Sequence, residues 1–206
     1  MKSIDNIVSL SKNGRVVPVE PRADIRDISV SENEAVLLNI LHVSGDVHVR
    51  VRLAGAGAKC VLNCIYLSNE NNMNNIVLEV LHESKNTHSE QKIKGVATDG
   101  GQVALTGVIR IGKDAAQSVG LQHHRGILLS EKAQIAATPR LEILTDDVQC
   151  AHGSAIGALD ERQVFYMMSR GIPEQTARPL LLKAFLHDIV PDDWHAVIDD
   201  WMARNV

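Results

Sequence analysis

One cysteine and one histidine in the last third of the chain have the spacing of side chains that could act together. In the segment DDVQCAHGSAIGALDE (residues 146–161), Cys150 and His152 are two positions apart. Two positions is the side-chain period of a β-strand, so in a strand both would leave the same face. Thiolate and neutral imidazole are suitable metal ligands. From the residues alone, a metal ligand and a core histidine with satisfied hydrogen bonds are equally good interpretations of His152.

Other residues with ligand chemistry form weaker patterns. His123 and His124 are adjacent, so in a strand they face opposite ways and only one could join a shared site. The simpler interpretation places one in the core or a turn and the other in solvent. Cys60 and Cys64 share one face of a strand. They could be soft ligands, but buried cysteines usually behave as small hydrophobic side chains, and we expect them to line the core.

Several functional classes are disfavoured by the sequence. It contains no phosphate-binding loop of the form GxxxxGK[ST], no GxSxG, no HExxH and no CxxC, so we expect the chain to bind no nucleotide itself. A net charge of −4 gives no electrostatic reason to expect nucleic acid. No apolar run resembles a signal peptide or a membrane span. Three cysteines are too few for a disulfide scaffold, and we expect a cytoplasmic protein.

The elements that must position these residues show a repeat. Similar segments carry glutamine at positions 102, 117, 134 and 149, which are 15, 17 and 15 residues apart. The runs EAVLLNILHV, DVHVRVRL, KCVLNCIYL and NNIVLEVLH are rich in β-forming residues and are separated by turns that contain Gly or Asn. Self-similarity at a fixed period is typical of a solenoid, with about 32 residues in each coil of two arms. An antiparallel jelly roll is the competing interpretation.

In this repeat, Cys150 takes the place of Val103 and Ile135, and His152 that of Leu105 and Ala137. These positions are expected to point inward. A histidine there must find hydrogen-bond partners or lie near an end of the solenoid.

A change in composition divides the chain. Tyr66 is the only aromatic residue of the Phe, Tyr and Trp types before residue 160. After Leu159 we expect three helices: one capped by Asp160 and ended by Gly171, one with Pro173 in its first turn, and a third over PDDWHAVIDDWMARN. The expected organisation is an N-terminal lead-in (1–30), a β-helix core (31–158) and a C-terminal helical domain (159–206).

The segment LLSEKAQIAATPRLEILTDDVQCAHGSAIGALDERQVFYMMSRGI (residues 128–172) resembles the SufB/SufD family of iron–sulfur cluster assembly scaffolds. Four motifs occur in the family's order: Ser-x-x-Ala, Pro-x-Leu-Glu-Ile, Asp-Asp-Val-x-Cys-x-His-Gly, and Leu-Asp-Glu followed by Phe-Tyr and Ser-Arg-Gly-Ile. The Cys-x-His form resembles the SufD branch. SufB relatives have an assembly cysteine on the strand matching LQHHRGILL (121–129), where this chain has none. The chain also lacks the length of typical SufD proteins, which indicates a minimal homologue or a fragment.

The resemblance implies an all-β solenoid, a right-handed parallel β-helix, followed by a small C-terminal α-helical domain. It implies a non-catalytic scaffold subunit that pairs with a SufB-like subunit or forms a homodimer. Cys150 and His152 would be associated with iron or a nascent Fe–S cluster, with His123 and His124 as possible additions. A SufC-like ABC ATPase would dock on the C-terminal helices, and we expect the docking residues to be Phe165, Leu181, Phe185, Trp194 and Trp201.

Two other functions are weighed against the scaffold. A β-helix enzyme that acts on carbohydrate needs acidic or basic groups clustered on one outer face. The close acidic pair of the late strands, Asp146 and Asp147, consists of neighbours that would point apart in a strand. A structural relative that binds no metal is the second alternative.

Overall fold

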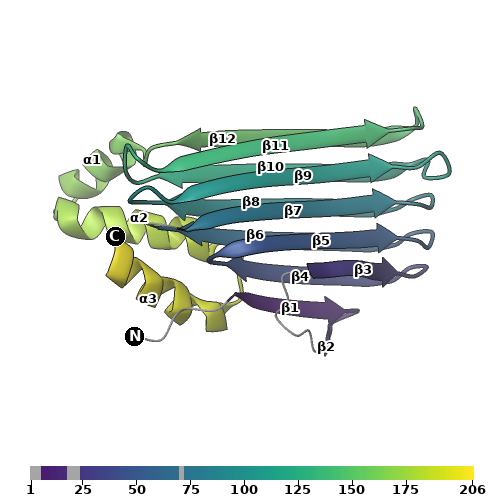
Figure 1. Cartoon of the computed structure of the whole chain (residues 1–206), viewed down its shortest axis with the longest axis horizontal. Helices are drawn as coiled ribbons and strands as arrows, with labels where there is room; N and C mark the ends of the chain where they lie inside the picture. Colours follow the sequence, from purple (N-terminus) through teal and green to yellow (C-terminus); the bar gives the residue numbers. More distant parts are fainter. Residues whose placement is uncertain (1–5, 18–23, 70–71) are drawn as a thin grey trace.

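A computed structural model of the protein describes residues 6–17, 24–69 and 72–206 (Figure 1). Within these ranges the strands are β1 (Ile7–Lys12), β2 (Arg15–Val17), β3 (Asp24–Val30), β4 (Ala35–His42), β5 (Gly45–Leu53), β6 (Lys59–Ser68), β7 (Met73–His82), β8 (His88–Ala97), β9 (Gln102–Ile111), β10 (Ser118–Leu128), β11 (Gln134–Ile143) and β12 (Val148–Gly157). They are followed by α1 (Glu161–Ser169), α2 (Glu174–His187), the 3-10 helix η1 (Asp192–Trp194) and α3 (His195–Asn205).

From β3 onward, successive strands alternate between two stacked sheets. Sheet A has the order β12-β10-β8-β6-β4-β1-β2, and sheet B has the order β11-β9-β7-β5-β3. Each strand after β4 pairs in parallel with the strand two places earlier in the chain. Each coil therefore contributes one strand to each sheet, which is the architecture of a β-solenoid. The predicted fold class, a solenoid with a C-terminal group of helices, is confirmed.

The glutamine repeat is only half preserved in the register. Gln134 pairs with Gln102, as predicted. Gln149 pairs with Val119, whereas Gln117 lies in the preceding turn with a positive φ of 60°. The prediction that all four glutamines are equivalent is therefore wrong. The physical reason is that the coils differ in length, so a spacing counted along the chain drifts against the hydrogen-bonded register.

The two ends of the solenoid are built differently. At the N-terminal end, β1 pairs antiparallel with β4 and with the three-residue β2, and the register of β3 against β5 shifts between Ile25 and Ile28. The segment expected to be a lead-in thus contains three strands, and its residues 1–5 and 18–23 lie outside the described part of the chain. Short strands and bulges are devices that discourage an edge from pairing with another chain.

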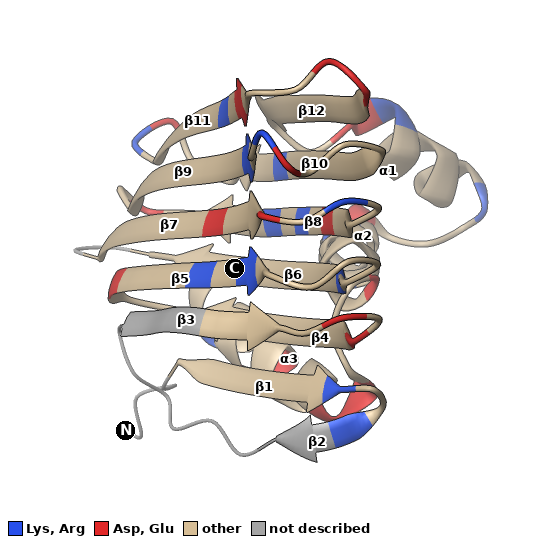
Figure 2. Cartoon of the chain, turned by 90° about the vertical axis from the view of Figure 1, so that its right-hand side faces the viewer, with Lys and Arg blue, Asp and Glu red and all other residues tan. Residues whose placement is uncertain are grey.

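At the C-terminal end, β11 and β12 form the last layer of the stack (Figure 2). Both are ten-residue strands whose registers against β9 and β10 run without a shift. Neither strand has a neighbour on its outer side among the described residues. This end therefore presents two long regular edges, which are templates for pairing with another chain.

The space between the sheets is filled mainly by aliphatic side chains, with Tyr66 as its largest ring. Tyr66 on β6 is fully buried, and its hydroxyl lies 2.9 Å from Nε2 of His124 on β10, two strands away in sheet A. The Tyr66 side chain fits only because two neighbouring positions are glycine. A Cβ at Gly95 would lie 2.3 Å from a Tyr66 ring carbon, and one at Gly126 would lie 2.7 Å from the hydroxyl oxygen. Tyr66 thus contacts residues of β8 and β10 and ties three neighbouring strands of sheet A together.

The C-terminal helices are anchored on the outer face of sheet A. A buried apolar cluster joins α2, η1 and α3 to the sheet, and its members include Leu41, Ile65, Leu67, Val96, Leu182, Leu186, Trp194, Ile198 and Trp201. The Asp160 carboxylate accepts a hydrogen bond from the Arg162 backbone N–H and caps α1, and Gly171, with φ of 86°, follows its end. Pro173 lies at the N-cap of α2 rather than in its first turn.

The contact of Tyr66 with Gly95 gives a stability prediction. Gly95→Ala should lower the free energy of unfolding by about 1–3 kcal/mol, because the new methyl overlaps a ring that the core cannot move aside. Gly157→Ala is the matched control, since nothing lies within 4 Å of a Cβ built there. Urea denaturation should leave this control within about 0.5 kcal/mol of the parent. Equal stabilities for the two variants would contradict the close packing described here.

Candidate functional site

Cys150 and His152 lie on β12 and point toward the interior of the solenoid. Cys150 pairs with Gly120 and His152 pairs with Gln122, and both partners on β10 are buried. The same-face prediction is therefore confirmed. The expected equivalence with Val103 and Leu105 is wrong in detail, because those residues lie on β9 in the opposite sheet. They too are buried, so the inward orientation is still correct.

Both side chains are more exposed than their partners on β10, because no other coil among the described residues covers the last one. Cys150 is half-buried and packs against the buried cluster of Ile109, Ile111 and Ala115. Burial raises the pKa of the Cys150 thiol above its ordinary value, and a hydrogen bond with the Gly120 backbone acts in the opposite direction. His152 is exposed, although its partner Gln122 is only 2% exposed. The pair therefore faces inward at an open end.

The adjacent histidines point to opposite faces, as the spacing predicted. His123 is exposed on the outer face of sheet A, away from Cys150 and His152. His124 points inward and is 4% exposed, with Nε2 2.9 Å from the Tyr66 hydroxyl and Nδ1 2.8 Å from Ser154 Oγ. Burial lowers its pKa to about 4. His124 is thus a neutral core histidine with both nitrogens engaged, and it holds the strand that carries His152.

Two buried glutamines, Gln122 and Gln91, form a polar row beneath Cys150 and His152 that the sequence analysis does not predict. The Gln122 amide donates to Gln91 Oε1 over 2.9 Å, and the Gln91 amide donates to the Val108 carbonyl over 3.2 Å. A Cβ at Gly107 would lie 2.2 Å from the Gln122 amide nitrogen, so this glycine makes room for the row. Polar residues at inward positions of two strands were the available signal. Cys60 and Cys64 are fully buried, as expected, and burial raises both pKa values to about 12.

The number of potential ligands is small. Among the described residues, no group of three or more His, Cys, Asp and Glu side chains could hold a metal ion. Cys150 and His152 are two donors with suitable chemistry for iron, fewer than the four of a closed tetrahedral site. They lie at an edge where a second chain could add ligands. What this chain offers is an incomplete ligand set, which we call the half-site.

The five helix residues expected to dock a partner differ in how exposed they are. Trp194 and Trp201 are 5% and 3% exposed and pack against sheet A, so they offer no surface to a partner. The expectation of an apolar stripe left free by the helices is wrong for them, because the sheet supplies the other half of their core. Leu181 and Phe185 are half-buried beside the sheet. Phe165 on α1 is 72% exposed.

Within the part of the chain that the structure describes, no helix has the length and apolar character to cross a membrane.

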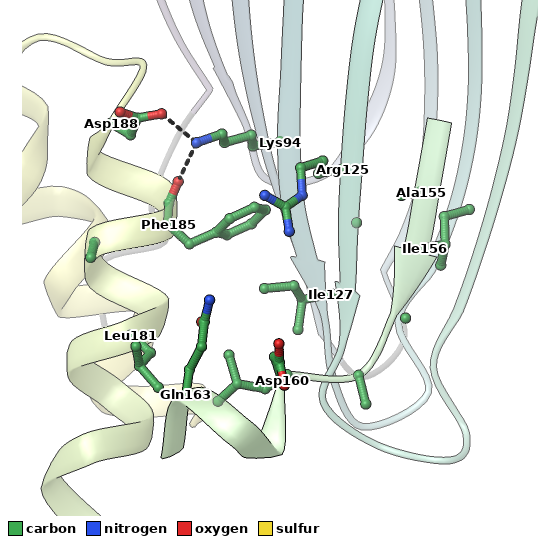
Figure 3. Close-up of a pocket in the computed structure, with 15 residues that line it drawn as sticks. Lys94, Arg125, Ile127, Ala155, Ile156, Asp160, Gln163, Leu181, Phe185 and Asp188 are labelled. Carbon is green, nitrogen blue, oxygen red and sulfur yellow. Dashed lines mark hydrogen bonds and ion pairs between the residues drawn. The ribbon is translucent and has the colours of Figure 1, made fainter. Parts of the chain in front are cut away.

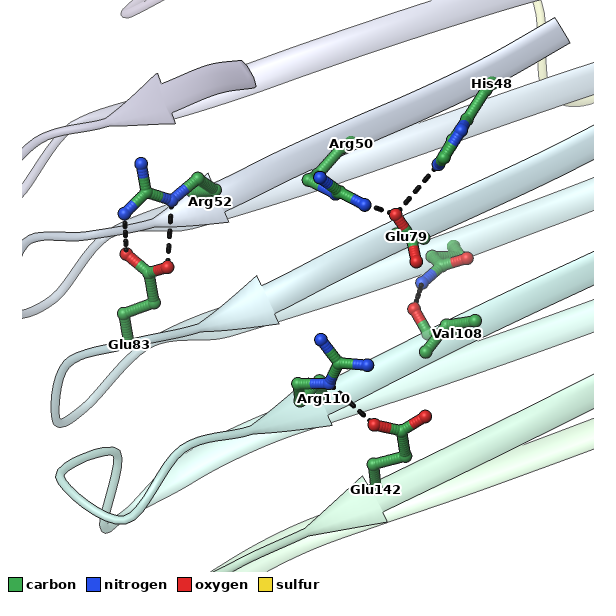
Figure 4. A network of polar contacts seen from close by, with 9 residues as sticks. His48, Arg50, Arg52, Glu79, Glu83, Val108, Arg110 and Glu142 are labelled. Carbon is green, nitrogen blue, oxygen red and sulfur yellow. Dashed lines mark hydrogen bonds and ion pairs between the residues drawn. The ribbon is translucent and has the colours of Figure 1, made fainter. Parts of the chain in front are cut away.

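The outer face of sheet B carries a row of oppositely charged side chains that pair with one another (Figure 4). Glu79 accepts from Arg50 Nε over 2.7 Å and lies 2.8 Å from His48 Nε2, and Arg110 Nε donates to Glu142 over 2.6 Å. Burial alone would raise the pKa of Glu79, but the His48 and Arg50 hydrogen bonds outweigh it and leave the pKa below its ordinary value.

The fold and the half-site define a class: a β-solenoid that displays a cysteine and a histidine on an unpaired terminal coil. Comparison with known proteins identifies the family. Residues 23–185 match the family described as "SUF system FeS cluster assembly, SufBD core domain". This match covers β3 to α2, including the half-site. The chain belongs to the SufBD family.

Individual relatives carry the names of both branches of the family. The chain is 26% identical to the iron–sulfur cluster assembly protein SufD of Escherichia coli (strain K12) over 183 residues, covering 87% of this chain and 42% of the relative. It is 38% identical to the chloroplastic protein ABCI7 of Arabidopsis thaliana over 110 residues, 53% of this chain and 23% of the relative. It is 27% identical to SufB of Bacillus subtilis (strain 168) over 134 residues, 65% and 29% of the two chains. The chain spans less than half the length of these relatives.

The buried histidines predict the pH dependence of stability. His124 and His82 both have pKa values lowered to about 4, and burial is the main cause. In the unfolded chain a histidine has a pKa near ~6.5, so the unfolded state takes up protons first as the pH falls. The contribution of these histidines to the free energy of unfolding should therefore be greatest above about pH 6.5 and should decrease toward pH 4. Urea denaturation across this range measures the slope.

Two variants test which histidine causes the pH dependence. The free energy of unfolding of His124→Gln should decrease less steeply as the pH falls, whereas that of His123→Gln, on the exposed face, should keep the slope of the parent. A parent slope in His124→Gln and a reduced one in His123→Gln would show that the buried ring is not the titrating group.

Proposed function

We propose that this chain is a non-catalytic scaffold subunit of iron–sulfur cluster assembly. The observation that carries the proposal is the position of Cys150 and His152. They share one face of the last strand, at the end of the solenoid that no described coil covers. Iron or a nascent cluster would be the cargo held there. Membership of the SufBD family supports this cargo over other metals.

The open end also supports pairing with a second subunit. The backbones of β11 and β12 have no outer neighbours among the described residues, and inward side chains such as Ile135, Ala137 and Ile156 are left partly or largely uncovered. The N-terminal end, by contrast, has the short strand and the register shift that discourage pairing. A SufB-like subunit or a second copy of this chain would cover the end and add ligands to the half-site.

The chemistry of the half-site sets its behaviour. Binding requires the thiolate of Cys150 and the neutral ring of His152, so protons compete with the metal. Burial already disfavours the thiolate, which makes the isolated chain a weak binder. A partner that brings positive charge or metal to the edge would favour ionisation. We therefore expect affinity to rise when the partner is present, and a reducing cytoplasm suits the free thiol.

A SufC-like ABC ATPase is the proposed source of ATP hydrolysis, and α1 is its proposed docking element. The exposed large apolar residues near this helix are Phe165, Tyr166, Met168 and Leu180. Phe165, at 72% exposure, is the most exposed of the four. Apolar residues grouped on one surface are typical of a protein interface.

The two alternatives have less support. A carbohydrate-active enzyme needs a general acid with a raised pKa. On the outer face of sheet B, hydrogen bonds with His48 and Arg50 lower the pKa of Glu79, and one with Arg110 lowers the pKa of Glu142. A metal-free structural relative would need no cysteine and histidine on one face of an open strand. The experiment that separates it from a scaffold is removal of the histidine.

His152→Ala should abolish iron retention by the complex with a SufB-like subunit and leave the fold unchanged. The ring is exposed in the isolated chain, so its loss opens no cavity in the core. Iron and sulfide content after anaerobic purification measures retention, and urea denaturation measures the fold. His123→Ala is the matched control, because it removes an exposed ring from the outer face of the adjacent strand.

The scaffold proposal is contradicted if His152→Ala and His123→Ala retain the same iron. The metal-free alternative gains support if His152→Leu also keeps full assembly activity.

Phe165→Asp should weaken ATPase binding at least about tenfold, as expected for removal of a central apolar contact. Met73→Asp is the control, since Met73 on β7 is 58% exposed and remote from the helices in sequence. Calorimetric titration with the ATPase measures both. Deletion of residues 173–206 is a poorer test, because it would uncover the core formed with Trp194 and Trp201. Equal affinities for the two variants would place the docking surface elsewhere.

A further inference from the structure

A cavity lies between α1, part of α2 and the outer face of sheet A. Its volume is about 470 Å³, within the usual range for a small-molecule site. Strands β8, β10 and β12 form one wall, and the helices form the other (Figure 3). The cavity is distinct from the half-site, because neither Cys150 nor His152 lines it, and Arg125 in its wall is adjacent to the inward-facing His124.

The charges around the cavity leave one cation uncompensated. Lys94 donates to the Asp188 carboxylate over 2.5 Å and to the Phe185 carbonyl over 3.1 Å, so its ammonium is engaged. Asp160 is held by Arg162, whose guanidinium donates to both carboxylate oxygens. Arg125 has no hydrogen-bond or carboxylate partner among the described residues, and its guanidinium carbon lies 5.9 Å from the centre of the Phe185 ring.

The other residues that line the cavity indicate which kind of ligand it could bind. Gln163 on α1 has a side-chain amide with no partner in the described structure, and Figure 3 shows it pointing into the cavity from the wall opposite Arg125. Apolar side chains from both walls complete the surface, including Ile127, Leu159, Leu181 and Phe185. Asp160 and Asp188 also line it, and ionised carboxylates repel a second negative charge on a ligand.

We infer that this cavity binds a small organic monocarboxylate, with its carboxylate on Arg125 and Gln163 and its apolar body against Ile127, Leu181 and Phe185. Guanidinium and amide N–H groups are the donors that match a carboxylate. Among the described residues that line the cavity, Arg125 is the one cation without an acidic partner, so a ligand with a single negative charge matches it better than a dianion does. The site is independent of the proposed scaffold role and of the half-site.

Calorimetric titration of the full chain with benzoate tests this inference, with neutral benzamide and inorganic phosphate as comparison ligands. Benzoate should bind about tenfold more tightly than benzamide, since a hydrogen bond to a charged group is worth about one order of magnitude in affinity. Phosphate should show no saturable binding. Arg125→Gln should remove the preference for benzoate, and Arg140→Gln, at an exposed position on β11, should leave it unchanged.

A second variant tests the place of binding without removing charge. Ala184 lines the cavity from an exposed position on α2, so Ala184→Phe should fill the space, keep the fold and weaken benzoate at least about tenfold. The inference is overturned if benzoate does not bind or binds no better than benzamide. It is also overturned if phosphate binds as well as benzoate, or if Arg140→Gln acts like Arg125→Gln.

Discussion

The unpaired backbone hydrogen-bonding groups at the ends of the solenoid are the constraint on which the rest of the structure depends. Parallel strands leave their backbone groups unpaired at both edges of each sheet, and a solenoid must cover, interrupt or use these edges. The N-terminal edges are interrupted by the short β2 and by the shift in β3. The C-terminal edges, β11 and β12, are long and regular. The residues with ligand chemistry lie on this second end, where a partner chain would complete both the sheets and the ligand set.

The core behind this end is organised to keep β12 in place. A solenoid interior without large aromatic side chains is filled mainly by Val, Ile and Leu, and Tyr66 is the exception that crosses from β6 past Gly95 to His124. His124 continues the connection to Ser154, two residues after His152 on the same strand. Polar contacts of this kind fix a register more specifically than aliphatic packing does. The exposed His152 is thus carried by a strand whose interior partners are well defined.

The sequence was sufficient for the periodic features and insufficient for the contacts between distant segments. The repeat of similar segments predicted the solenoid, and the side-chain period of two in a strand predicted the shared face of Cys150 and His152. The repeat made Cys150 equivalent to Val103 and Ile135, which lie in the opposite sheet, and only the hydrogen-bonded register shows that Gly120 lies beside Cys150. An amphipathic helix likewise shows that it has an apolar face without showing what covers it. Trp194 and Trp201 were therefore expected on a docking surface and are buried against sheet A.

Hydrogen exchange of the backbone amides, measured with and without a SufB-like subunit, tests the central claim most directly. In the chain alone, the outward amides of β11 and β12 should exchange quickly, because no described residue accepts their hydrogen bonds. Addition of the partner should slow exchange within residues 134–157 and leave β1 to β3 unchanged. Protection that appears on β1 to β3 while residues 134–157 stay unprotected would contradict the account, since the open coil would then not be the end at which this protein works.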